Sequence, residues 1–225
     1  MKKKLLLILL AFAQLGVFSQ QLRNKYGDVY YDANLYDNNY ESIEGSPYLD
    51  PEFKPAKINE LNETKFVRFN AFEGKIEVKE KNGVIVLSDS DSYVISLQDG
   101  SNKIYETRTF KDESGNSQVS FFELLKEQPH YKLYLKESIT LTKEVKAQGY
   151  AKAEPAKFKR AVDTFYVSDF MDNSRELLII PYRMKGLLAM FPQKQKVLKS
   201  FTKEHKLKTR NAEDLIKIFD YYFSD

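Results

Sequence analysis

Cysteine and tryptophan are absent from this chain, and histidine occurs only twice, at His130 and His205. Without cysteine no disulfide can hold the fold, so a hydrophobic core must supply its stability. The two histidines are far apart in the sequence, and a zinc site would need carboxylates to complete a ligand set around them. We therefore expect surface or boundary imidazoles and predict no metal site.

Long hydrophobic runs are also missing, apart from residues 5–13, which follow the three lysines at residues 2–4. This run is shorter than the ~20 residues that a spanning helix needs, and Gln14 interrupts it. A basic start, a short apolar core and a small residue at Ser19 are typical of a cleavable secretory signal rather than a membrane anchor. We expect residues 1–19 to be removed near Ser19, leaving a periplasmic or secreted protein without a transmembrane segment.

Neither sign of charge is in excess once this segment is set aside. The chain has 35 basic and 32 acidic residues, and residues 1–19 carry three of the lysines and no acid, which leaves 32 of each. A neutral balance offers no electrostatic argument for nucleic acid, and we expect no such partner. The glycine-rich loops that cradle phosphates and the G-x-S-x-G elbow of serine hydrolases are absent as well, so no cofactor is predicted.

Residues 20–64 are rich in Tyr, Asn and Asp and keep neither a helical nor a strand period. Between residues 28 and 63 nine acids face only Lys54 and Lys57. The stretch "GSPYLDPEFKPAKI" places a proline at every fourth position, which blocks a helix, beside large apolar anchors. We predict an extended strap over residues 20–64 that lies across a core and ends as a sheet begins, near Ile58 or Phe66.

The pattern from residue 65 onward alternates between apolar and polar residues, which is typical of strands. Seven such stretches lie between residues 65 and 145, separated by turn signals that include Asn82-Gly83 and Asp89-Ser90-Asp91. Residues 146–157 read as a long loop, and a further hairpin is expected to turn at residues 171–174. We predict an α+β, mainly β protein, with an antiparallel β-meander, curved or barrel-like, over residues 65–181.

Helical periodicity begins after Pro181 and predicts a two-helix hairpin that caps the sheet over residues 182–225. "YRMKGLLAMF" is expected to form a short helix or turn before it. Asn211 is a plausible N-cap, followed by acids in the first turn. The buried faces are predicted to contain Val197, Leu198 and Phe201, then Leu215, Ile216, Phe219, Tyr222 and Phe223.

Several motifs resemble catalytic or metal-binding patterns without completing them. Ser200-Phe201-Thr202-Lys203 matches the S-x-x-K of penicillin-recognising enzymes, but Lys208-Thr209-Arg210 lacks the glycine of the accompanying K-T-G. "SDSDS" and "DANLYDNNY" lack the glycine and glutamate of a calcium loop. A pair of carboxylates in a cleft needs no sequence signature. We predict no catalytic, cofactor-binding or metal-binding residue.

The most uneven charge distribution lies in residues 194–210, which carry seven cations and a single acid, Glu204. A solvated helix face would explain this pattern. A docking face for an anionic partner, such as lipid headgroups of the cell envelope, is a second interpretation. A third is that the acidic residues 28–63 lie across these helices.

Four stretches resemble a group of exported proteins common in Bacteroidetes-type bacteria: a signal that ends in "FSQ", "GSPYLDPEFKPAKI", "VRFNAFEGKIEVK" and "FTKEHKLKTRNAEDLIKIFDYY". The resemblance extends over most of the chain. It implies export and the order of strands before helices. No activity is assigned to that group, so it implies no catalytic residue.

Taken together, these patterns favour a non-enzymatic protein of the cell envelope, a binding or interaction module for an envelope protein, glycan or lipid. An alternative is a carrier that holds an apolar or lipid ligand in a curved sheet beneath a helical lid. The same alternating strands equally permit a filled core. A carbohydrate-active hydrolase is a weaker alternative, since it requires only two suitably placed carboxylates.

Overall fold

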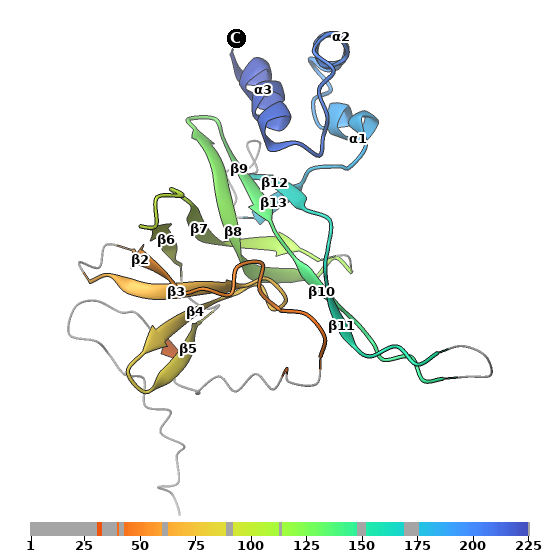
Figure 1. Ribbon diagram of the computed structural model, residues 1–225. Coiled ribbons are helices and arrows are strands. Elements are labelled where there is room, and N and C mark those ends of the chain that lie inside the picture. The colour runs from red at the N-terminus through yellow and green to blue at the C-terminus, as the bar shows by residue number, and fades with distance from the viewer. Residues whose placement is uncertain are drawn as a thin grey trace, which may run out of the picture.

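A β-rich body followed by three helices makes up the computed structural model (Figure 1). The structure describes residues 31–32, 40, 43–59, 63–88, 92–112, 114–147, 152–168 and 176–224. The predicted signal at residues 1–19 lies outside the described residues. The prediction of a mainly β protein whose helices follow its strands is confirmed.

Thirteen strands and three helices lie within the described ranges. The strands are β1 (Tyr31–Asp32), β2 (Lys54–Ile58), β3 (Lys65–Asn70), β4 (Lys75–Glu80), β5 (Gly83–Leu87), β6 (Val94–Leu97), β7 (Ile104–Lys111), β8 (Ser117–Gln128), β9 (Tyr131–Lys136), β10 (Ile139–Thr142), β11 (Lys157–Arg160), β12 (Thr164–Ser168) and β13 (Glu176–Ile179). The helices are α1 (Met184–Ala189), α2 (Gln195–Glu204) and α3 (Ala212–Phe223).

Eleven of these strands form one sheet in the order β1-β5-β4-β3-β2-β6-β7-β13-β12-β9-β8. From β2 to β5 the chain runs as an antiparallel meander, but β6 then returns to the far side of β2. The turn signal at Asp89-Ser90-Asp91 lies outside the described ranges, and the strands on either side of it, β5 and β6, are not neighbours and so do not form a hairpin. The expected start of the sheet at residue 65 is too late, since β2 is a central strand.

Pro55 explains how a proline can occupy a central strand. It pairs with Phe66 of β3, and its carbonyl accepts a hydrogen bond of 2.7 Å from the Gln98 N–H. The backbone nitrogen of a strand residue points to the same neighbour as its carbonyl, so the missing N–H faces the point where β6 ends at Leu97. The proline therefore removes a ladder bond only at the end of that strand.

Five strands close into a barrel, because β7 pairs with β8 as well as with β13. The ring runs β7-β8-β9-β12-β13, and the closing contact between β13 and β7 is parallel. Each of the five strands contributes one side chain to a buried cluster: Phe110, Phe122, Tyr134, Tyr166 and Leu177. One residue per strand is what the interior layer of a small barrel requires, so these side chains fill it. The hairpin predicted for β12 and β13 is present, and its turn lies outside the described residues.

A second core is formed by side chains of strands β2 to β7 and by Tyr93, and Phe121 of β8 packs into it. The turn between β3 and β4 is joined to β8 there. The Gly74 carbonyl accepts hydrogen bonds from the Ser120 hydroxyl (3.1 Å) and the Phe121 N–H (3.4 Å). Gly74 has a φ of 68°, and a Cβ built on it would lie 2.6 Å from the Ser120 Oγ. Only glycine meets both the left-handed backbone and the close approach.

β10 and β11 form a separate two-stranded arm that projects from the body (Figure 1). Residues 146–157, predicted to be a loop, continue this arm: Val145 and Glu154 exchange backbone hydrogen bonds of 2.9 Å. Residues 148–151 lie outside the described ranges. The predicted loop is therefore the outer part of a hairpin.

Residues 43–53 run extended from this arm to the sheet. The Glu44 carbonyl accepts from the Phe158 N–H (2.8 Å), and the Pro47 carbonyl accepts from the Phe72 N–H (3.2 Å). The Tyr48 hydroxyl reaches Glu77, whose side chain is fully buried, at 2.9 Å. This segment thus covers the outer face of β3 and β4 and excludes water from it.

A charged network fastens the same segment. Arg68 forms an ion pair of 2.5 Å with Glu77, and its guanidinium lies 3.7 Å from the Tyr48 ring centroid and 4.4 Å from that of Phe53. Asn70 donates a further hydrogen bond of 3.0 Å to Glu77. A buried carboxylate is tolerated only when its lone pairs are satisfied in this way.

The three helices pack on the outer face of β9 and β12, around Leu133 and Val167. α1 precedes the predicted helical pair, at the stretch expected to be a short helix or turn. Asn211 caps α3, as predicted, by accepting a hydrogen bond of 2.9 Å from the Asp214 N–H. Val197, predicted to be buried, is 53% exposed. On α3 the fully buried residues are Leu215, Ile218 and Phe219.

Candidate functional site

A groove between α1 and α2 is the candidate functional site. α2 is amphipathic: Leu198 and Thr202 are buried, and Lys196, Lys199 and Lys203 lie beside this buried face. Residues three and four apart lie on one helix face, so Lys196, Lys199 and Lys203 form a row along α2. Three cations of the predicted cluster thus point to the same side.

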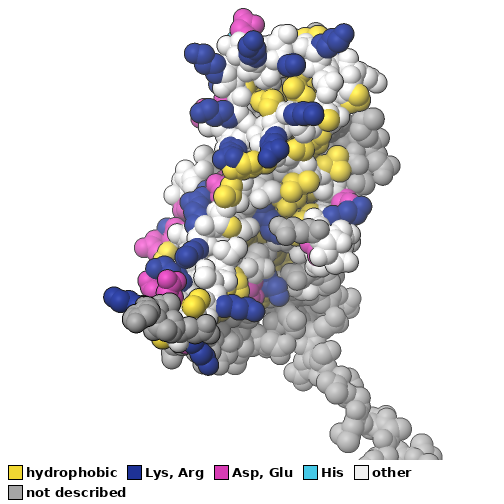
Figure 2. Space-filling model, turned by 90° about the vertical axis from the view of Figure 1, so that its right-hand side faces the viewer, with side chains coloured by type: hydrophobic (Ala, Val, Ile, Leu, Met, Phe, Trp, Pro, Cys, Tyr) yellow, Lys and Arg dark blue, Asp and Glu magenta, His cyan; other side chains and the backbone are white. Residues whose placement is uncertain are grey.

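The groove has a volume of about 830 Å³ and an apolar floor. Met184 and Leu188 of α1 and Leu207, which follows α2, supply its apolar lining. Lys185 and Lys206 complete a rim of five lysines around it. In Figure 2 the helical part of the molecule carries Lys and Arg side chains around hydrophobic ones on this face. We call this site the lysine groove.

No acid lies within ion-pair distance of these five lysines in the part of the chain that the structure describes. This differs from the strands, where Lys65, Lys103 and Lys132 each pair with carboxylates. Five like charges around a common groove repel one another, and a bound anion would relieve that repulsion.

Lys206 occupies a backbone position that usually belongs to glycine. Its φ is 53°, and it follows the C-cap residue His205. The Leu207 N–H bonds to the Thr202 carbonyl (2.9 Å) and the Lys206 N–H to the Lys203 carbonyl (3.3 Å), which is the Schellman arrangement. A side chain in this left-handed conformation costs about 1–2 kcal/mol, yet the position carries a charge that lines the groove.

Three cations of the predicted cluster do not line the groove. The Lys194 ammonium donates to the Tyr222 carbonyl (3.0 Å), and the Arg210 guanidinium lies 3.2 Å from the Tyr182 ring centroid. Lys208 donates its backbone N–H to Asp214. Conversely, the contribution of α1 to the groove was not predicted, because the sequence contains no signal that brings Lys185 beside α2.

The predicted contact between the acidic residues 28–63 and the basic helices is not found for the described part of that segment. Glu44 pairs with Lys157 of the arm at 2.6 Å, and Glu52 pairs with Lys54 at 2.8 Å. The hydrogen bonds of residues 43–53 to β11 and the β3–β4 turn hold these acids on the β body.

The S-x-x-K stretch does not form a nucleophile pair. The Ser200 hydroxyl donates to the Lys196 carbonyl (3.3 Å), and Lys203 lines the groove. The Thr209 hydroxyl donates to the Tyr182 carbonyl (2.6 Å). Both hydroxyls therefore bond to backbone carbonyls.

Both histidines contact aromatic rings: His130 stacks on Phe223, and the ring of His205 is tilted by 52° against that of Phe201. His130 lies 5.8 Å from the Phe223 ring centroid, and His205 lies 4.6 Å from that of Phe201. Among the described residues, no group of three His, Asp or Glu side chains could hold a metal ion. Nor is any helix of the described ranges long and apolar enough to cross a bilayer.

Comparisons with known proteins add no further assignment. The sequence matches no protein-family model, and no curated protein and no solved structure shows significant similarity to it.

Proposed function

We propose that the protein is a non-enzymatic binding module of the cell envelope, and that its lysine groove docks onto an anionic lipid surface. The single observation that carries this proposal is the rim of five lysines, with no carboxylate partner among the described residues, around an apolar floor. Lysine rims attract lipid phosphates, and an apolar floor accepts part of an acyl chain. The secretory signal predicted at residues 1–19 supports the envelope as the location.

The expected strength follows from the number of lysines. Each lysine near an anionic membrane contributes about 1 kcal/mol, so five give about 5 kcal/mol at low ionic strength. This is binding in the range of peripheral proteins, and it weakens with salt because the attraction falls off over a Debye length of about 8 Å at physiological ionic strength. The proposal thus predicts reversible attachment.

Sedimentation with vesicles tests the proposal. We expect the protein to bind phosphatidylglycerol vesicles and to leave phosphatidylcholine vesicles unbound. A triple variant, Lys196→Gln with Lys199→Gln and Lys203→Gln, removes about 3 kcal/mol and lowers the partition coefficient roughly 100-fold. The matched control replaces three exposed lysines of the arm, at positions 143, 152 and 159, with Gln and retains binding.

The absence of cysteine allows a second readout at the groove itself. A Gln195→Cys variant carries the only thiol of the chain, and an environment-sensitive dye attached there shifts to the blue when it enters the lipid interface. The same dye at Lys159→Cys on the arm reports no change. Equal binding to both kinds of vesicle, or a shift at the arm instead of the groove, would refute the proposal.

A further inference from the structure

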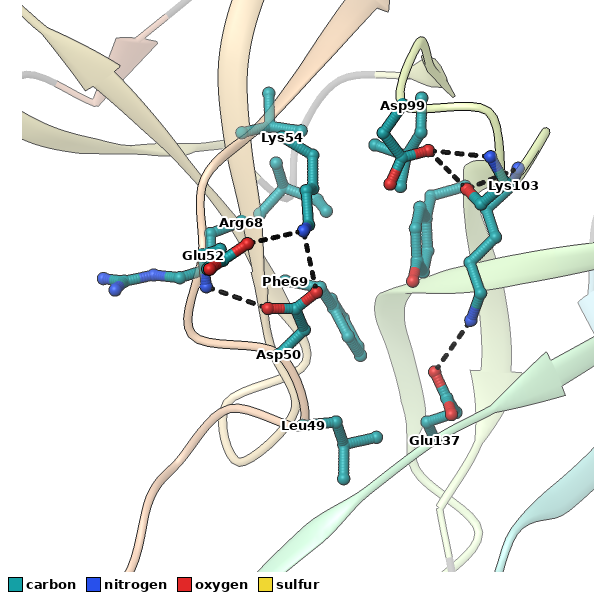
Figure 3. A pocket seen from close by; sticks show the side chains of 14 residues that line it. Leu49, Asp50, Glu52, Lys54, Arg68, Phe69, Asp99, Lys103 and Glu137 are labelled. Carbon is teal, nitrogen blue, oxygen red and sulfur yellow. Dashed lines mark hydrogen bonds and ion pairs between the residues drawn. The ribbon is translucent and has the colours of Figure 1, made fainter.

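A second groove, of about 260 Å³, lies between residues 49–54, strand β3 and the turn between β6 and β7 (Figure 3). Glu137, just after β9, forms its far side. We call it the strap groove. It lies on the β body, and none of its lining residues belongs to the lysine groove.

Aromatic rings form part of the wall. The Phe69 ring lies between the two charged sides in Figure 3, and it stacks on Tyr105 with centroids 5.3 Å apart. Tyr105 is only 6% exposed, and its hydroxyl forms no hydrogen bond with any residue of the described ranges. A buried hydroxyl without a partner is rare and costly, and it indicates a group that the protein alone does not supply. Burial raises the pKa of Tyr105, so this hydroxyl stays a neutral donor.

The cations of the strap groove already have carboxylate partners. On one side Lys54 pairs with Asp50 (3.3 Å) and Glu52 (2.8 Å). On the opposite side Lys103 pairs with Glu137 at 3.6 Å, and these two residues face Phe69 across the groove (Figure 3). An anionic ligand would have to break these pairs to gain a partner, so the groove is not built for one.

Asp99 is the acceptor that remains. Hydrogen bonds from the Ser101 hydroxyl (2.6 Å) and N–H (3.0 Å) hold its Oδ1 and lower the pKa of Asp99, so it is an ionised carboxylate. No lysine or arginine in the described part of the chain lies within ion-pair distance of it. An exposed carboxylate, a buried hydroxyl and an aromatic ring thus line the same groove.

We infer that the strap groove binds a neutral polyhydroxylated ligand, a single sugar ring. The apolar C–H face of a sugar packs on an aromatic ring such as Phe69, while its hydroxyls donate to Asp99 and accept from Tyr105. A volume of 260 Å³ is below the range of about 300–1,000 Å³ that drug-sized ligands occupy, so it suits one ring rather than a chain of sugars.

Saturation-transfer NMR with a panel of neutral monosaccharides at millimolar concentration tests this inference. We expect at least one sugar to receive magnetisation from the protein. Tyr105→Phe removes only the unpaired hydroxyl. Because a hydrogen bond to the ligand is lost, we expect the dissociation constant to rise about tenfold. Asp99→Ala also weakens sugar binding, and because the position is exposed the substitution should not destabilise the fold. Tyr221→Phe, an exposed tyrosine on α3, leaves sugar binding unchanged.

Thermal unfolding of the same variants gives an independent readout. Tyr105→Phe is expected to be as stable as the parent or more so, because it removes a buried polar group that the free protein leaves unpaired. A panel of zwitterionic amino acids serves as the competing ligand class. Binding of amino acids alone, no binding at all, or loss of stability in Tyr105→Phe would each overturn the inference. The triple lysine variant of the lysine groove keeps sugar binding, which separates this test from that of membrane docking.

Discussion

Lys136 offers a test of how the barrel tolerates charge. It lies at one end of the barrel, with its ammonium 3.8 Å from the Phe110 ring centroid and 5.7 Å from that of Phe122. No carboxylate of the described ranges pairs with it. Burial lowers the pKa of Lys136 to about 8, from the ordinary lysine value of 10.5. The cation therefore destabilises the folded state at neutral pH.

The magnitude follows from this pKa difference. A drop of about 2.5 corresponds to about 3.4 kcal/mol of desolvation cost, at 1.36 kcal/mol for each pKa unit. Lys136 is only partly buried, and solvent screening reduces this figure, so we expect a cost of about 2 kcal/mol below pH 8. Because the folded pKa is the lower one, the folded state binds fewer protons than the unfolded state between pH 8 and 10.5. Stability therefore rises with pH across that window, and the cost is gone above it.

Lys136→Met should raise the free energy of unfolding at pH 7 by about 2 kcal/mol, or the melting temperature by about 4–8 °C for a chain of this size. Urea unfolding of both proteins at pH 7, 9 and 10.5 measures the difference, in which all other titrating groups cancel. We expect the advantage of the variant to shrink as pH rises. The control, Lys159→Met at an exposed arm position, should change stability little at any pH. A gain that is independent of pH, or a loss at pH 7, would refute the reasoning.

Two further predictions concern charges at strained or buried positions. Glu77→Gln leaves Arg68 without its carboxylate partner and should lower the free energy of unfolding in urea by about 3–5 kcal/mol, with faster proteolysis of residues 43–53. The control is Glu80→Gln, at a half-exposed partner of Lys65, which should lower it by less than about 1 kcal/mol. Equal losses in the two variants would contradict the role of the buried network. Lys206→Gly removes the strain of a side chain on a left-handed backbone, so it should raise the free energy of unfolding by about 1 kcal/mol, and it should weaken vesicle binding about fivefold. A loss of stability would contradict the strain. Unchanged binding would contradict the role of this lysine.

Most strands were predictable because alternation is a local signal. The order of the strands in the sheet was not, because β6 beside β2 and β13 beside β7 are contacts between segments that no local pattern joins. β2 itself lay within the predicted strap, and its Pro55 fits a central strand only because the neighbouring strand β6 ends there. Glu77 shows the same limit: alternation predicts it to face solvent, and only the covering segment 43–53 buries it.

The candidate site was predictable in part. Clustering of cations in residues 194–210 gave a docking face for an anionic partner as one of three interpretations, and the helical period explains why Lys196, Lys199 and Lys203 share a face. The apolar floor depends on how α1 folds against α2, which the period of either helix does not determine. The strap groove left no trace in the sequence, because its lining comes from four separate parts of the chain.

Closure of the barrel by β13 makes the order of synthesis matter. Until residues 176–179 emerge, β7 and β12 each present an unpaired edge, and the aromatic interior stays open on one side. Such edges invite pairing with other chains, so a polypeptide truncated before Glu176 should aggregate rather than fold.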